Sequence, residues 1–249
     1  MGTRFGRRRF LARIAGGGTA LSITTARTRT VQSQSADELI WPSTQRNMSN
    51  TGAINRSGLK GYPQVTSSTT FRGSVSISPV ASTEYTYIQT LANLWAFDSE
   101  GEAWRFTTDG DMSGRSAPAL DTDTIYFGDG SDTESRDSGN YASVYAVDRQ
   151  SGDQRWRFRV ANRDWMDVGV CLDADRLYTG TERSTLEGPD GAKGQLFALS
   201  KTDGTLEWVA DVAMTGGESP AIDGGVVYAP TDAGQIFALE ASTGSTLWE

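Results

Sequence analysis

The 249-residue sequence contains no histidine and a single cysteine, Cys171, and these two shortages exclude several kinds of chemistry. Without histidine there is no histidine general base, no serine–histidine triad and no zinc or copper site of the usual kind. One cysteine cannot form a disulfide within the chain or supply a cluster of thiolate ligands. No catalytic residue is therefore assigned from the sequence.

Lysine is also scarce, because only Lys60, Lys193 and Lys201 stand among the 23 basic residues, against 31 acidic ones. Seven arginines and no acid lie in residues 1–35, so the rest of the chain has a net charge near −15, against −8 for the whole. Such a chain does not neutralise phosphates, and nucleic acid is not an expected partner. Its acidity and its preference for arginine are similar to those of salt-adapted extracellular proteins of halophilic archaea; the alternative is an ordinary acidic secreted protein.

Residues 1–35 resemble a twin-arginine export signal. The run Gly6-Arg7-Arg8-Arg9-Phe10-Leu11 precedes a mildly apolar stretch, residues 12–26. That stretch is too short and too rich in glycine and threonine for a spanning helix, so we expect no transmembrane helix in the mature chain. The segment predicts an exported protein, extracellular or at the cell surface, and the alternative is a basic N-terminal tail.

One sequence motif occurs four times along the chain: an alternating apolar run, a short polar turn with a glycine, and a tryptophan. The alternation predicts a strand, and the glycine predicts a tight turn with positive φ, so each motif is expected to form a hairpin. A lone hairpin cannot bury the tryptophan, which must therefore dock on a neighbouring unit and is interpreted as structural. The repeated residues are Gly101, Gly152, Gly204 and Gly244, with Trp104, Trp156, Trp208 and Trp248.

The spacing of the tryptophans predicts an all-β fold, a β-propeller with four-stranded antiparallel blades. The intervals are 52, 52 and 40 residues, and one blade needs about 40. Four blades can be recognised, at about 73–107, 116–160, 167–211 and 218–249, with first strands expected over 75–80, 116–120, 167–172 and 218–222. Residues 36–72 form a leader, in which Gln64–Arg72 is expected to be the outer strand of the last blade and to close the ring.

Four blades would form an open arc with uncovered sheet faces and edges, which invite pairing with another chain. We therefore expect the chain to be a fragment of a larger ring. The alternatives are a small closed ring, and self-association of two arcs into one ring.

The copy Ala146-x-Asp148-x-x-x-Gly152-x-x-x-Trp156 resembles the repeat of the pyrroloquinoline-quinone-like (PQQ-like) β-propeller family, and the resemblance covers roughly residues 41–249. Two copies depart from it, with Ser200 and Glu240 where the family prefers aspartate, which should weaken a turn contact. The family includes quinoprotein alcohol dehydrogenases and the propeller lipoprotein of the outer-membrane assembly machine.

The resemblance implies three functions. We favour a non-catalytic binding scaffold without a cofactor. The first alternative is a PQQ- and calcium-dependent alcohol or sugar dehydrogenase, but many such enzymes carry an adjacent-cysteine disulfide that this chain lacks, and their catalytic aspartate matches no position here. The second alternative is a cell-surface assembly module.

Two insertions, residues 129–141 and 181–193, lie between the second and third strands of adjacent blades and should project from one face. The loops that link blades emerge there too, and such loops carry binding residues on a rigid scaffold. The candidates for contact with a protein, peptide or glycan partner are Arg115, Arg163, Asp164, Trp165 and Glu218.

The acidic insertion also offers a weak calcium site. Asp129, Asp132 and Glu134 could supply the carboxylate oxygens that Ca²⁺ prefers, although their spacing does not match the calcium-loop pattern. The alternative is that both insertions are solvated acidic loops.

Overall fold

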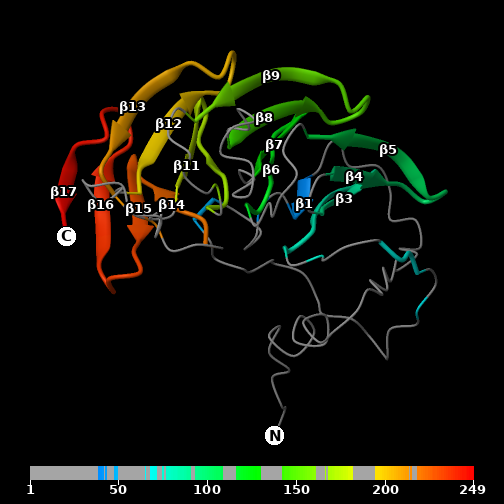
Figure 1. Cartoon of the computed structure of the whole chain (residues 1–249), viewed down its shortest axis with the longest axis horizontal. Coiled ribbons are helices and arrows are strands. Elements are labelled where there is room, and N and C mark those ends of the chain that lie inside the picture. Colours follow the sequence, from blue (N-terminus) through cyan, green and yellow to red (C-terminus); the bar gives the residue numbers. More distant parts are fainter. Residues whose placement is uncertain are drawn as a thin grey trace, which may run out of the picture.

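A computed structural model of the chain describes residues 39–41, 43, 48–49, 65, 68–71, 75, 77–90, 93–108, 116–129, 142–160, 166, 168–181, 194–212, 214 and 218–249. The regular structure of this part is entirely β, which confirms the predicted fold class. Four sheets fan along an arc, with their first strands on the inside and their fourth strands on the outer rim (Figure 1). Within the described ranges, no helix could cross a membrane.

Each sheet contains an antiparallel meander of four strands in chain order. The first has β2 (Val80–Ser82), β3 (Thr86–Gln89), β4 (Asn93–Phe97) and β5 (Glu102–Thr107). The second has β6 (Ala119–Leu120), β7 (Thr124–Asp129), β8 (Ser143–Asp148) and β9 (Gln154–Arg159). The third has β10 (Cys171–Leu172), β11 (Arg176–Gly180), β12 (Leu196–Ser200) and β13 (Leu206–Ala210). The fourth has β14 (Ala221–Asp223), β15 (Val226–Pro230), β16 (Ile236–Glu240) and β17 (Thr246–Trp248). We refer to these sheets as blades one to four.

The first strand of every blade begins later than the sequence predicted. In three blades it starts directly after a proline, which has no N–H to donate to the sheet and so delays the pairing. These prolines are Pro79, Pro118 and Pro220. In blade three, the N–H of Val170 instead donates to the carbonyl of Ala117 in blade two, 3.0 Å away.

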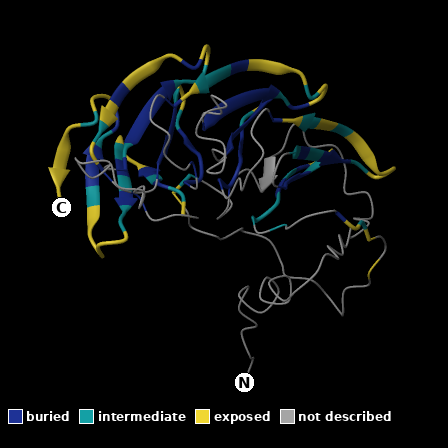
Figure 2. Ribbon diagram, viewed as in Figure 1, coloured by how far each residue is buried: buried dark blue, intermediate teal, exposed yellow. Residues whose placement is uncertain are grey.

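The core lies between the blades. The inner strands β7, β8, β11 and β12 are almost wholly buried, whereas the fourth strands are exposed on one side (Figure 2). Each internal cluster joins facing surfaces of two consecutive blades, so every blade is stabilised by its neighbours.

Two short parts of the leader contact the inner strands of the blades. A strand that the sequence did not predict, β1 (Leu39–Trp41), pairs with β2 and makes the first sheet five-stranded. Further along, the carbonyl of Met48 accepts a hydrogen bond from the N–H of Ile222 in blade four, 2.9 Å away. Residues 1–38, with the twin-arginine motif, lie outside the described residues, as do residues 64, 66, 67 and 72 of the expected segment Gln64–Arg72.

The turns between third and fourth strands show what the two departures from the repeat change. In blade two, Oδ1 of Asp148 accepts the N–H groups of Gln150 and Ser151, each at 2.9 Å. Asp98 does the same in blade one. Ser200 and Glu240 accept no such pair of backbone bonds within the described turns, as expected from their shorter or longer side chains.

Candidate functional site

Every blade carries the same row of three residues across its second, third and fourth strands. In blade two, Tyr126 pairs with Ala146, and Ala146 pairs with Trp156. Because the alanine is small, the two rings meet beside it, with centroids 5.8 Å apart. The other rows are Tyr87, Ala96 and Trp104; Tyr178, Ala198 and Trp208; and Tyr228, Ala238 and Trp248.

The tryptophan of each of the first three blades is received by a turn of the next blade. Trp156 lies so close to Gly204 that a Cβ added to the glycine would come within 2.6 Å of the ring. The indole N–H donates to the carbonyl of Lys201, 2.9 Å away. We call such a glycine, with the carbonyl three residues before it, a socket. The other two sockets are Gly152 with Arg149, which receives Trp104, and Gly244 with Ala241, which receives Trp208.

The glycine of a socket meets two requirements at once. Its φ lies between 72° and 78° in the three sockets, a conformation that other residues rarely adopt. It also has no side chain that would keep the indole away. A tryptophan and the glycine of the following blade are therefore two halves of one contact.

The buried tyrosines Tyr87 and Tyr178 lie beside two of these carbonyl groups. The hydroxyl of Tyr87 donates to the carbonyl of Arg149 at 3.1 Å. The hydroxyl of Tyr178 donates to Oδ2 of Asp173 in its own blade at 2.5 Å and lies 3.3 Å from the carbonyl of Ala241. Burial raises the pKa of both hydroxyls above the ordinary value, so they stay protonated as donors. The carbonyl of Arg149 thus accepts two bonds from the preceding blade, one from Tyr87 and one from Trp104.

One ion pair ties a socket turn to the preceding blade. Nζ of Lys201 lies 2.5 Å from Oδ2 of Asp121 in blade two. The same ammonium group donates to the carbonyls of Asp173 and Ala174 in its own blade, both at 2.9 Å. This lysine, one of three in the chain, is therefore part of a blade-to-blade contact.

The two insertions leave the blades at one end, as the strand order requires, and their bases are firmly bonded. Asp129 and Ser143, which flank the first insertion, are paired residues of β7 and β8. At the second insertion, the N–H of Thr181 donates to the carbonyl of Gln195 at 2.7 Å, and the N–H of Gln195 donates to Oγ1 of Thr181 at 3.0 Å. We call this edge of the blades, at which the second strands end and the third strands begin, the loop face.

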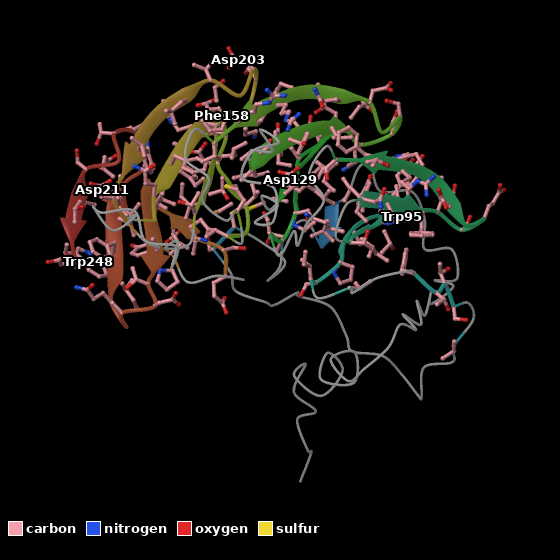
Figure 3. The ribbon with its side chains drawn as sticks, in the orientation of Figure 1. Trp95, Asp129, Phe158, Asp203, Asp211 and Trp248 are labelled. Atoms are coloured by element: carbon pink, nitrogen blue, oxygen red, sulfur yellow. The ribbon has the colours of Figure 1, made fainter. Side chains whose placement is uncertain are left out.

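Asp129 holds the base of the first insertion from inside. Its side chain is buried; Oδ1 accepts the N–H of Ser143 at 2.7 Å, and Oδ2 accepts the hydroxyl of Tyr145 at 3.0 Å (Figure 3). Asp132 and Glu134, the other two predicted calcium ligands, lie outside the described residues. In the described ranges, no three acidic or thiol side chains gather around a common point. The calcium site stays a prediction.

Of the predicted partner-binding residues, the structure describes Glu218. It is exposed at the loop face, and its carbonyl accepts the N–H of Gly169 in blade three at 2.8 Å. Arg115, Arg163, Asp164 and Trp165 lie outside the described residues. The residue after Arg115 is described: Ser116 is buried and its Oγ accepts the N–H of Gly128 at 3.1 Å. That these five residues together form a partner-binding site stays a prediction.

Cys171 is buried in the inner strand of blade three. Burial raises the pKa of its thiol to about 12. The thiolate is the reactive form of cysteine, so this side chain acts as a small apolar residue.

Comparison with known proteins gives a family match for the C-terminal part of the chain. Residues 140–249 match the family model described as outer membrane protein assembly factor BamB. The chain is 28% identical over 114 residues to the protein of that name from Yersinia pestis, a match that covers 42% of this chain and 26% of the relative. It is 29% identical over 111 residues to the one from Burkholderia pseudomallei, covering 45% of this chain and 26% of the relative.

Solved structures share the fold at low identity. The crystal structure of BamB from Moraxella catarrhalis superposes with a TM-score of 0.56 at 18% identity, over 73% of this chain and 53% of that one. Quinohemoprotein alcohol dehydrogenase ADHIIG from Pseudomonas putida HK5 superposes with a TM-score of 0.60 at 14% identity, over 84% of this chain and 39% of that one. The chain thus spans about half of the first structure and less of the second. These matches show that residues 140–249 are similar to PQQ-like β-propeller repeats and that the four blades share the fold of such propellers.

Proposed function

We propose that the chain is an exported, non-catalytic scaffold that binds a protein or peptide partner through its loop face. The observation that supports the proposal is the way in which hydrogen bonds hold the bases of the two insertions. Buried bonds at Asp129, Ser143, Thr181 and Gln195 fix the bases of two insertions on adjacent blades. A rigid frame that presents long loops is typical of binding proteins, because the frame reduces the entropy lost on binding.

The names of the matched relatives also support a role in binding other proteins. Their name, outer membrane protein assembly factor, describes proteins that act on other proteins. The likeness to quinohemoprotein alcohol dehydrogenase is one of fold, and it adds no support for oxidation chemistry. Export through the twin-arginine route, and adaptation of the acidic surface to salt, are parts of the proposal that rest on the sequence.

The test uses the full chain, immobilised in concentrated salt and exposed to the extracellular fraction of the cells that produce it. We expect Arg163→Ala and Trp165→Ala each to weaken capture of the bound protein about tenfold or more, as central contacts do. The control is Gln150→Ala, at an exposed turn of blade two remote from the loop face. It should capture the partner as the parent does.

Equal capture by all three variants, with unchanged circular dichroism, would show that the loop face is not the binding surface. The non-catalytic part is tested separately by titrating the chain with PQQ and Ca²⁺ and measuring dye reduction with alcohols and sugars. We expect neither quinone binding nor turnover. Calcium-dependent turnover would show that the chain is an enzyme.

A further inference from the structure

The fourth strand of blade two, β9, forms the outer edge of its sheet, and we call the outward side of Gln154–Arg159 the β9 edge. Among the described strands β9 pairs with β8 alone, and it lies on the outer rim of the arc (Figure 1). The N–H of Val160 donates to the carbonyl of Ala142 at 2.9 Å, one position beyond the last pair of β8 and β9. Hydrogen-bonded and non-hydrogen-bonded pairs alternate in an antiparallel ladder, so the backbone N–H and C=O groups of Arg157 and Arg159 point away from β8.

The same two residues carry positive charge on one face of the sheet, because residues two apart in a strand share a face. Arg159 is exposed. Arg157 is half-buried and is held in place: its Nε donates to Oγ of Ser143 at 2.9 Å, and its guanidinium lies over the ring of Tyr145, 5.1 Å from the centroid. The neighbouring Arg155 is paired with carboxylates of its own blade. The β9 edge therefore presents alternate arginines beside outward-facing backbone groups.

The corresponding positions in blades one and three are different. In β13 they hold Val209 and Asp211. In β5 they hold Arg105 and Thr107, and the guanidinium of Arg105 lies over the ring of Trp95, 4.9 Å from the centroid. Among these three blades, only blade two places arginine at both positions, in a chain with 31 acidic and 23 basic residues. Charge complementarity with such a surface favours an acidic partner.

We propose that the β9 edge binds an extended acidic segment of a partner protein, which adds to blade two as an antiparallel fifth strand. The outward N–H and C=O groups of Arg157 and Arg159 bond to two partner residues that lie directly opposite them, two positions apart. The side chains of those residues lie on the face of the arginines, where carboxylates pair with guanidinium groups. The partner segment therefore carries aspartate or glutamate at alternate positions.

A strand makes this contact, and the loops of the loop face do not take part in it. The inference therefore does not depend on the proposed function.

The arginines select the partner strand more than they attract it from a distance. The chain has a net charge of −8, so it exerts little long-range attraction on an acidic segment. In 1 M salt the Debye length is about 3 Å, so only charge pairs in direct contact keep their attraction. A basic strand would place like charges opposite Arg157 and Arg159, which destabilises the pairing. The backbone ladder thus supplies affinity, and the arginines supply register and selectivity.

The experiment measures the binding of short fluorescent peptides to the full chain by fluorescence anisotropy in 1 M salt. The probe alternates glutamate and threonine over eight residues, and the control of the same composition has four threonines followed by four glutamates. We expect the probe to bind about tenfold more tightly than this control. Arg159→Glu should weaken binding of the probe about tenfold or more, because it places like charges opposite each other. The matched variant Arg105→Glu, with the same change of charge on β5, should bind the probe as the parent chain does.

Two modified probes separate strand addition from attraction between charges. Methylation of the backbone nitrogens of the glutamates removes the N–H groups that face β9, because each glutamate lies opposite an arginine. Methylation of the threonine nitrogens changes only groups that face away from β9. We expect the first modification to abolish binding and the second to leave the affinity within about twofold of that of the probe.

Equal binding of the two methylated peptides to the parent chain would mean that charge alone holds the peptide, and the fifth strand would be wrong. This comparison needs no variant of the protein, so it decides even where Arg159→Glu does not fold. The proposal is also wrong if the probe does not bind, or if it binds no better than the control of the same composition. It is equally wrong if Arg159→Glu, with the circular dichroism of the parent, binds the probe with unchanged affinity.

Discussion

The indole of Trp156 lies against Gly204 of the next blade, and its N–H donates to the carbonyl of Lys201, 2.9 Å away. The contact recurs twice along the chain, so the glycine of each turn depends on the tryptophan of the blade before it. The arc is held together by these paired residues and by the apolar clusters around them.

Replacing a socket glycine should destabilise the protein more than replacing a glycine with the same backbone conformation elsewhere. Gly204→Ala places a Cβ within 2.6 Å of Trp156 and at φ 74°, whereas Gly224, at φ 56°, has no atom within 4 Å of the added Cβ. Left-handed strain alone costs about 1–2 kcal/mol, and overpacking adds about 1–3 kcal/mol. Urea denaturation should therefore show the larger loss of unfolding free energy for Gly204→Ala. Equal losses in the two variants would mean that the ring does not press on the turn.

The indole hydrogen bond should contribute to stability at Trp208 and not at Trp248. Trp208→Phe keeps an aromatic ring and removes the donor to the carbonyl of Ala241, a bond worth about 1 kcal/mol. Trp248→Phe, at the same repeat position on the open face, should change the unfolding free energy little. A loss of similar size at Trp248 would indicate that its face is already occupied.

Blades three and four approach closely at their inner strands. A Cβ on Gly169 would lie 1.9 Å from Oγ and 3.0 Å from Cβ of Ser219. We expect Gly169→Ala to lower the unfolding free energy by about 1–3 kcal/mol, and Ser219→Gly to restore part of it in the double variant. Thermal unfolding of the two single variants and the double variant gives the coupling. Additive effects would place the two residues further apart than the structure does.

Acid should weaken the turn of blade two. Hydrogen bonds from Arg155, and from the backbone N–H of Ser151, lower the pKa of Asp148 to about 2. Because this pKa lies below the unfolded value of about 3.9, the carboxylate stabilises the folded state above about pH 4, and the contribution is lost between about pH 4 and pH 2.

Asp148→Asn keeps an oxygen for the N–H groups of Gln150 and Ser151 and removes the charge that pairs with Arg155. The pair is partly exposed, so solvent screening limits its worth to less than about 1 kcal/mol at pH 7. The difference in melting temperature between parent and variant should shrink as pH falls from 5 to 2. A difference that does not change over this range would show that Asp148 does not titrate as described.

The hairpins could be predicted from the sequence because their signals are local. Alternation, turn glycine and tryptophan lie within about a dozen residues of one another, and each of the four expected hairpins is present as the third and fourth strands of a blade. The apolar pattern predicts first strands that are too long in all four blades. In three of them a proline, Pro79, Pro118 or Pro220, lacks the N–H needed for pairing, and these prolines are visible in the sequence.

The contacts between blades could not be derived from the repeat alone. The sequence shows that each copy has a glycine and a tryptophan, but not that Trp104 meets Gly152 of the next copy, 48 positions further along. The tyrosine that recurs in the second strands is a further signal of the repeat that the sequence contains. Of the predicted partner-binding residues, all but Glu218 lie outside the described residues, and the binding role of all five stays a prediction.

The most direct test of the account is the relative exposure of the four repeat tryptophans in the parent chain, measured by hydroxyl-radical labelling of a dilute sample shown to be monomeric by light scattering. The structure predicts the fastest labelling at Trp248, slow labelling at Trp156 and Trp208, and an intermediate rate at the half-buried Trp104. If Trp248 in the monomer is labelled as slowly as Trp208, its face is covered by the chain itself, and the open arc is wrong.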